Sequence, residues 1–117
     1  MKIFDSPASA ATLPPGPLRD LVVECVGFVG YRPEEDGCAV LIEPGDVDRV
    51  LTELALPHRL CEVPFEAVRV VEGHHVGVFL ANNQCAIVFL VPDAPWLPQT
   101  VREHLERHME LEPRKRG

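Results

Sequence analysis

The chain has 117 residues, the size of one ordinary domain. Two domains of half that length would each have a hydrophobic core too small to be stable without disulfides or bound metals. Hydrophobic residues make up 46% and charged residues 25%, a composition that excludes a chain disordered throughout. The 18 Asp and Glu outnumber the 11 Lys and Arg, and the formal net charge of −7 argues against nucleic-acid binding, because phosphate backbones repel an acidic body.

The expected cellular compartment is inferred from motifs that the sequence lacks. No stretch approaches the roughly 18 apolar residues that a membrane-spanning helix needs, and the first residues lack the apolar run of about 7–15 residues of a signal peptide. Neither a C-x-x-C motif nor a metal-ligand spacing links the four cysteines, which are Cys25, Cys38, Cys61 and Cys85. We therefore expect a cytoplasmic protein with reduced thiols and no membrane partner.

The first half of the chain predicts two helices and one strand. Residues 1–16 are rich in proline and are expected to form an extended lead-in. Apolar residues at helical spacing predict a helix over 17–27, although the valine-rich end of this segment leaves a strand as the alternative. A short apolar strand is expected over 38–42, followed by a helix that Asp46 caps and Pro57 ends.

The second half predicts three strands, at 67–71, 75–81 and 85–91, joined by turns rich in Gly and Asn. A last helix is expected over 98–112, before a short basic tail at 113–117. The predicted fold is therefore a single α+β domain over residues 17–112. It has three helices and a four-stranded, largely antiparallel sheet in the order α-β-α-β-β-β-α.

The hairpins also predict which residues share a face. Three-residue loops would pair Val71 with His75 and Ala81 with Cys85. One face is then purely aliphatic: Val68, Val70, Val76, Val78, Leu80, Ala86, Val88 and Leu90. The other, here called the second face, is mostly apolar and carries the candidate binding residues Arg69, His75, Gly77, Phe79 and Phe89. Because a sheet that is apolar on both faces needs two coverings, a helix, a second subunit or a ligand is expected to cover the second face.

Three further residues are interface candidates: Trp96, His104 and His108. Trp96 is the only tryptophan, and it either anchors the entry to the last helix or serves as an interface hot spot. His104 and His108 are four residues apart within an apolar stripe, a position typical of half-buried core or interface residues. A zinc site needs a third ligand that the sequence does not name, so we expect no metal and no cofactor.

These features predict a small acidic binding or interaction protein in the cytoplasm. We expect a homodimer formed through the second face or the last helix, with an accessory or partner-neutralising role and a surface for a basic protein. The alternative is a small-molecule-binding protein or enzyme with a pocket on the second face. There Gly77 would leave a dent and the Arg69 guanidinium would hold a carboxylate or phosphate. The sequence names no catalytic residue, because it lacks phosphate-binding loops and a nucleophile elbow.

Overall fold

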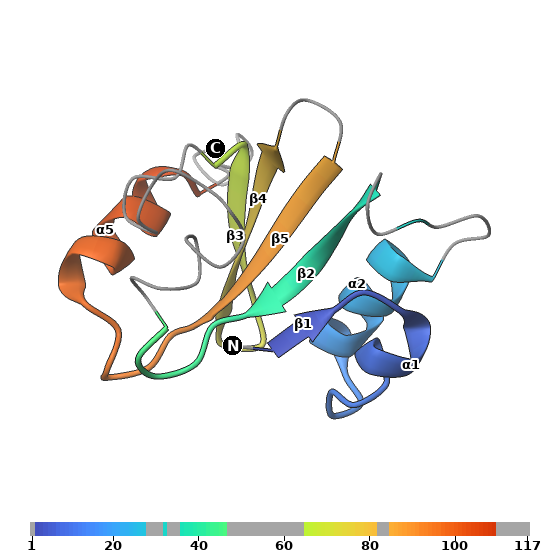
Figure 1. Ribbon diagram of the computed structural model, residues 1–117. Coiled ribbons are helices and arrows are strands. Elements are labelled where there is room, and N and C mark those ends of the chain that lie inside the picture. Colours follow the sequence, from blue (N-terminus) through green and yellow to red (C-terminus); the bar gives the residue numbers. More distant parts are fainter. Residues whose placement is uncertain (1, 28–31, 33–35, 47–64, 82–84, 110–117) are drawn as a thin grey trace, which may run out of the picture.

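A five-stranded mixed β-sheet forms the centre of the molecule, with helices on both faces (Figure 1). The computed structural model describes residues 2–27, 32, 36–46, 65–81 and 85–109. The strands are β1 (Lys2–Phe4), β2 (Gly37–Leu41), β3 (Ala67–Val71), β4 (His74–Ala81) and β5 (Cys85–Pro92). The helices in these ranges are α1 (Pro7–Ala10), α2 (Pro17–Val26) and α5 (Gln99–Arg107). The predicted class, a single α+β domain, is confirmed.

The sheet differs in detail from the predicted one. Its strand order is β1-β2-β5-β4-β3, so β1 adds a fifth strand that the sequence analysis did not predict. The pairing of β2 with β5 is parallel, whereas the other neighbours are antiparallel. β2 approaches β5 closely at Gly37, where a side chain would overlap the carbonyl oxygen of Ala86. The sheet is therefore mixed, and not the four-stranded, largely antiparallel sheet that was expected.

The N-terminal segment corrects a second expectation. Pro7–Ala10 form α1 instead of an extended lead-in. The hydroxyl of Ser6 accepts a hydrogen bond from the Ser9 backbone N–H at 3.1 Å, and Pro7 lies at the start of the helix, where its missing N–H costs nothing. Phe4 and Ala10 are fully buried, so this segment contributes to the core.

The other described elements lie close to their predicted places. α2 confirms the helix expected over 17–27 and excludes the strand alternative. α5 is shorter than the predicted 98–112, because the chain leaves the helix after Arg107 and the His108 carbonyl accepts a hydrogen bond from the Val68 N–H of β3. The helix expected after Asp46 and the basic tail fall outside the described residues.

The β3–β4 turn changes the predicted faces. Val71 pairs with His74 across a turn of two residues, Glu72 and Gly73, and not with His75 across three. Both turn residues have positive φ, 48° and 73°, as the tight turns of two-residue hairpins require. The predicted Ala81–Cys85 pair is confirmed. Because side chains alternate along a strand, a slip of one residue moves every side chain of β3 to the opposite face.

Two clusters of buried residues lie on the two sides of the sheet. α1 and α2 cover one side, where Val22 and Val26 pack on strand residues such as Leu90. α5 covers the other side, where Val101 and Leu105 pack against Phe89. Figure 1 shows the sheet between these helices. Within the described ranges, no helix is long and apolar enough to span a bilayer.

Candidate functional site

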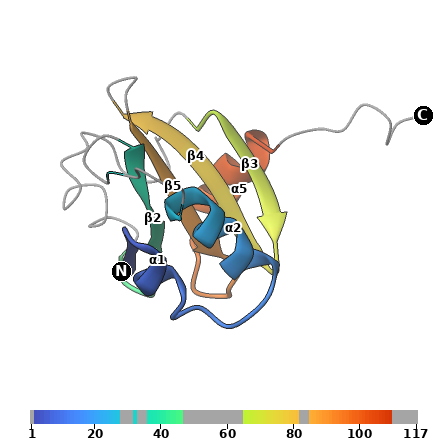
Figure 2. The same cartoon turned by 90° about the vertical axis from the view of Figure 1, so that its right-hand side faces the viewer.

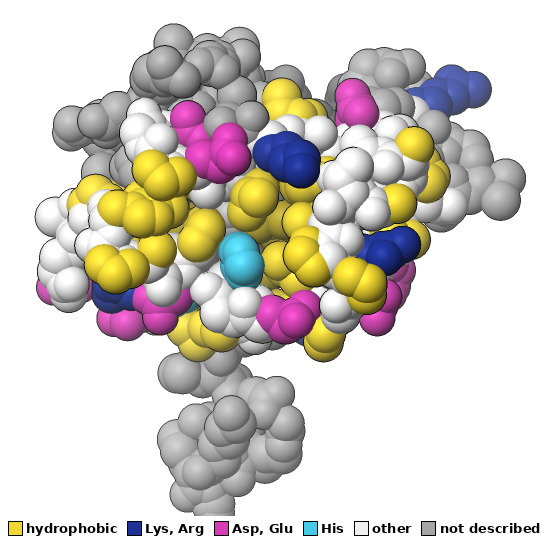
Figure 3. All heavy atoms as spheres, turned by 90° about the horizontal axis from the view of Figure 1, so that it is seen from below, with side chains coloured by type: hydrophobic (Ala, Val, Ile, Leu, Met, Phe, Trp, Pro, Cys, Tyr) yellow, Lys and Arg dark blue, Asp and Glu magenta, His cyan; other side chains and the backbone are white. Residues whose placement is uncertain are grey.

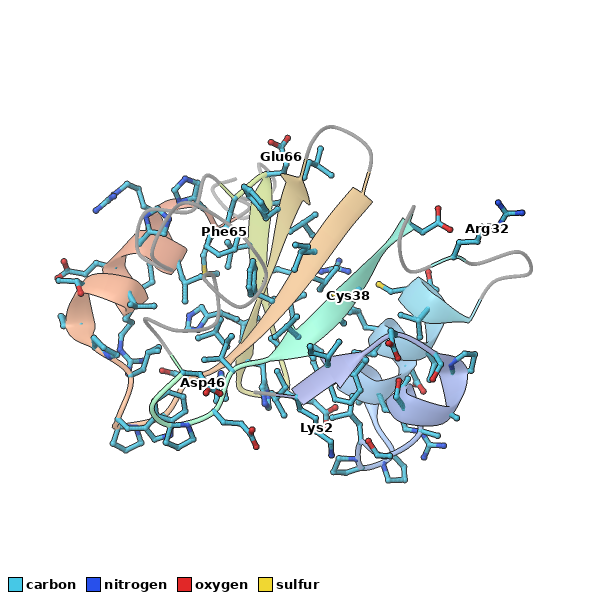
Figure 4. All side chains as sticks on the ribbon, viewed as in Figure 1. Lys2, Arg32, Cys38, Asp46, Phe65 and Glu66 are labelled. Atoms are coloured by element: carbon cyan, nitrogen blue, oxygen red, sulfur yellow. The ribbon has the colours of Figure 1, made fainter. Side chains whose placement is uncertain are left out.

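The second face of the sheet is covered by the chain itself. α5 packs over it, and Phe65 fills the dent expected at Gly77, where a Cβ would lie 2.7 Å from the ring of Phe65. The Phe65 and Phe89 rings meet edge to face with centroids 5.8 Å apart. Figure 4 shows Phe65 on the α5 side of the sheet. Of the three coverings that the sequence left open, the structure shows a helix, α5, on this face.

The predicted second-face residues do not all come together. His75, Gly77 and Phe79 share the α5 side with Phe89, in agreement with the β4–β5 register. Arg69 instead pairs with Val76 and faces the α2 side. The structure therefore separates Arg69 from His75, Phe79 and Phe89, which lie on the opposite side of the sheet.

His75 is a buried polar residue on the α5 side. It is 5% exposed, and its Nδ1 atom has no hydrogen-bond partner among the described residues. Burial lowers the pKa of His75 from its ordinary 6.5, and the nearby Arg102 cation lowers the pKa further, while Glu106 acts in the opposite direction. Burial under α5 therefore favours the neutral form of the imidazole.

The remaining interface candidates lie around the same core. Trp96 is half-buried and packs against the α5-side cluster. The rings of His104 and His108 lie with centroids 4.6 Å apart, and both contact the Phe65 ring. Their spacing brings them together as expected for i, i+4 positions on a helix. In the described part of the chain, no three His, Cys, Asp or Glu residues are grouped so that they could hold a metal ion.

A hollow of the described surface, here called the α2 groove, runs between α2 and β3. Figure 2 shows α2 in front of the sheet, with β3 at the sheet edge to its right. The outer part of the groove is a wide, open depression of about 570 Å³ lined by Pro17, Asp20, Leu21, Glu24, Cys25 and Arg69. Its walls come from two elements that are far apart in sequence, and both helix and strand contribute charged side chains.

The inner part of the groove is apolar. It is a hollow of about 290 Å³ whose floor is formed by β-sheet residues Ala67, Val76, Val78 and Val88. Leu21, Cys25 and Arg69 border both parts, so the two form one continuous depression. Among the described residues that line the inner hollow, Arg69 is the only charged one.

The charges of the groove have no partners in the described structure. The guanidinium of Arg69 makes neither an ion pair nor a hydrogen bond to any described residue, and the same holds for the carboxylates of Asp20 and Glu24. Asp20 and Glu24 are four residues apart and therefore lie on the same side of α2. The groove thus has an acidic wall on the helix, a cation on the strand and an apolar floor between them.

Cys25 lies in the wall of this groove. Burial raises the pKa of its thiol from the ordinary 9.0, the Glu24 carboxylate raises that pKa further, and the Arg69 guanidinium lowers it. The thiol is therefore protonated at neutral pH, which makes it an apolar wall component and a poor nucleophile.

The sequence analysis missed this groove, although part of its signal was present. Asp20 and Glu24 stand beside Leu21 and Cys25 in α2, so an acidic edge next to an apolar stripe could have been recognised from helical spacing. The contribution of Arg69 to the groove could not have been recognised from the sequence, because it depends on the two-residue turn that reverses the faces of β3.

A second, smaller hollow lies at the lower end of the molecule. It has a volume of about 260 Å³ and is lined by Leu13, Pro14, Leu18, Leu41, Glu72 and His74. Figure 3 shows hydrophobic side chains gathered on this lower face, with a histidine and charged side chains among them. Its polar groups are already engaged: the Glu72 carboxylate accepts a hydrogen bond from Leu18, and the His74 ring lies 2.9 Å from the Glu72 carbonyl.

No protein-family model, curated protein or solved structure matches the chain.

Proposed function

We propose that the protein is a binding domain that holds a segment of a partner protein in the α2 groove, and that this segment combines apolar with basic side chains. The observation that carries the proposal is the apolar floor beside the carboxylates of Asp20 and Glu24, which pair with no described residue. Apolar side chains of the partner would cover Val78 and its neighbours, and its cations would meet the acidic helix wall.

Charge favours a basic partner over a second copy of the chain. The net charge of −7 attracts basic proteins over several ångströms and repels another acidic copy. The second face, one of the two surfaces on which self-association was expected, is covered by α5, the last helix and the other such surface. Self-association is therefore kept as an outcome that the experiment distinguishes, and the proposed occupant is a basic segment of another protein.

The test is a titration of the isotopically labelled full chain, followed by nuclear magnetic resonance. The probe is an N-acetylated, C-terminally amidated peptide, Lys-Leu-Lys-Ala-Leu, and the sign-reversed peptide Glu-Leu-Glu-Ala-Leu is its control. We expect the basic peptide to bind and the acidic one not to bind. Binding should weaken as salt is raised, because exposed charges are screened.

A pair of matched variants assigns the binding to the groove. Asp20→Lys combined with Glu24→Lys should weaken the basic peptide about tenfold or more, since two attractions become repulsions. Glu103→Lys combined with Glu106→Lys changes the net charge by the same amount on α5, and should leave most of the affinity. Equal losses of affinity in both double variants would overturn the proposal. Signal broadening that depends only on protein concentration would also overturn it, in favour of self-association.

A further inference from the structure

Arg69 gives the α2 groove a second recognition element. It borders both parts of the groove and is the only charged residue among the described ones that line the inner apolar hollow. A guanidinium presents a fork of N–H donors that matches a carboxylate in a bidentate pair, and no described residue takes that role. The groove therefore offers an anion position directly beside an apolar position.

We propose that Arg69 binds the C-terminal carboxylate of the partner segment while the apolar side chain of the same last residue enters the inner hollow. This inference rests on the proposed function of the α2 groove. The upstream basic side chains of the segment then lie along Asp20 and Glu24 in the outer part.

The geometry of peptides favours a terminal carboxylate over an Asp or Glu side chain. In an extended segment, consecutive side chains point in opposite directions, so an acidic side chain and an apolar neighbour cannot both face one corner of a groove. A C-terminal residue carries its carboxylate and its side chain on the same Cα. The hollow of about 290 Å³ is at the lower limit of ligand pockets, about 300–1,000 Å³, which suits one residue.

The test compares three peptides on the full chain. They share the sequence Lys-Leu-Lys-Ala-Leu and are N-acetylated: one has a free C-terminal carboxylate, one is amidated, and one is amidated with Asp in place of Ala. The free acid is expected to bind about tenfold more tightly than the amide, the effect of one charge-assisted pair. Arg69→Gln should remove this difference, and Arg107→Gln on α5 should retain it.

Each other outcome has a distinct meaning. Equal affinity of the acid and the amide would overturn the role of Arg69 and leave the proposed function intact. If the Asp-containing amide binds as tightly as the free acid, Arg69 binds an acidic side chain, and the proposal of a C-terminal carboxylate is overturned. Binding of none of the three peptides would overturn both proposals. A thermal melt of Arg69→Gln that matches the wild type shows that any loss of affinity comes from the guanidinium.

Discussion

The carboxylate of Glu72 accepts a hydrogen bond from the backbone N–H of Leu18 at 2.7 Å, and so joins the β3–β4 turn to the first turn of α2. The N-cap of α2 is Gly16, which has no side chain to cap the helix itself. A residue 54 positions away supplies the missing acceptor, and its negative charge lies at the positive end of the helix dipole. This contact fixes one end of the helix that forms the acidic wall of the α2 groove.

Glu72→Ala is therefore expected to destabilise the protein by about 1 kcal/mol, the usual effect of losing an N-cap acceptor. Equilibrium unfolding in urea measures the change. Glu103→Ala is the control, because within the described part of the chain its carboxylate accepts one exposed hydrogen bond, from Gln99 at 3.2 Å, which should contribute little. A loss in the control as large as that in Glu72→Ala would show that the Leu18 contact is not responsible.

Gly77→Ala is expected to destabilise the protein by about 1–3 kcal/mol, because the new methyl group meets the ring of Phe65 at 2.7 Å in a packed core. A double-mutant cycle with Phe65→Leu separates this clash from a backbone effect. In the Phe65→Leu background the same substitution should cost clearly less, since the ring is gone. Strictly additive effects on the free energy of unfolding would contradict the assigned contact.

Lowering the pH should destabilise the folded protein through the protonation of His75. Burial lowers the pKa of this imidazole in the folded chain below 6.5, so the unfolded chain binds the proton at a higher pH than the folded chain does. The contribution of His75 to stability is therefore complete above about pH 6.5 and is lost as the pH falls toward the lower folded pKa. Urea unfolding at about pH 7.5 and 5.5 measures the free energy of unfolding at each pH. The decrease from about pH 7.5 to 5.5 should be smaller for His75→Leu than for the wild type. An equal loss in both proteins would contradict a titrating His75.

The charges of the α2 groove should control the reactivity of Cys25. Glu24→Gln is expected to speed alkylation of the thiol at about pH 8 and Arg69→Gln to slow it, because Glu24 raises the pKa of Cys25 and Arg69 lowers it. Pulses of iodoacetamide followed by mass spectrometry of the Cys25 peptide measure the rates. Acceleration in both variants would mean that exposure, and not charge, sets the rate.

The elements of this fold were largely readable from periodicity. The stripe of Leu18, Leu21, Val22 and Cys25 predicted α2, and alternating valines placed β3, β4 and β5 within about one residue. β1 was missed because three residues carry too little pattern. α1 was missed because prolines were interpreted only as breakers, although Ser6-Pro7 followed by Ser9 is a helix-start pattern.

The candidate site was less readable, and one turn explains why. Glu72 adopts a left-handed φ that is uncommon outside Gly, Asn and Asp, and the predicted register assumed a loop of three residues. That difference of one residue moved Arg69 from the rings of the second face to the α2 groove. The packing of the Phe65 ring over Gly77 could not be predicted either, because this contact joins residues 12 positions apart and no local sequence pattern indicates it.

The most direct test of the account is a map of the amide signals that shift when Lys-Leu-Lys-Ala-Leu amide is titrated into the full chain. Binding in the α2 groove predicts that the largest shifts fall on Leu21, Cys25, Arg69 and Val78, which line it. Signals of Val101 and Leu105, buried under α5, should stay in place. Shifts that concentrate on α5, or no shifts at millimolar peptide, would contradict a binding function for this groove.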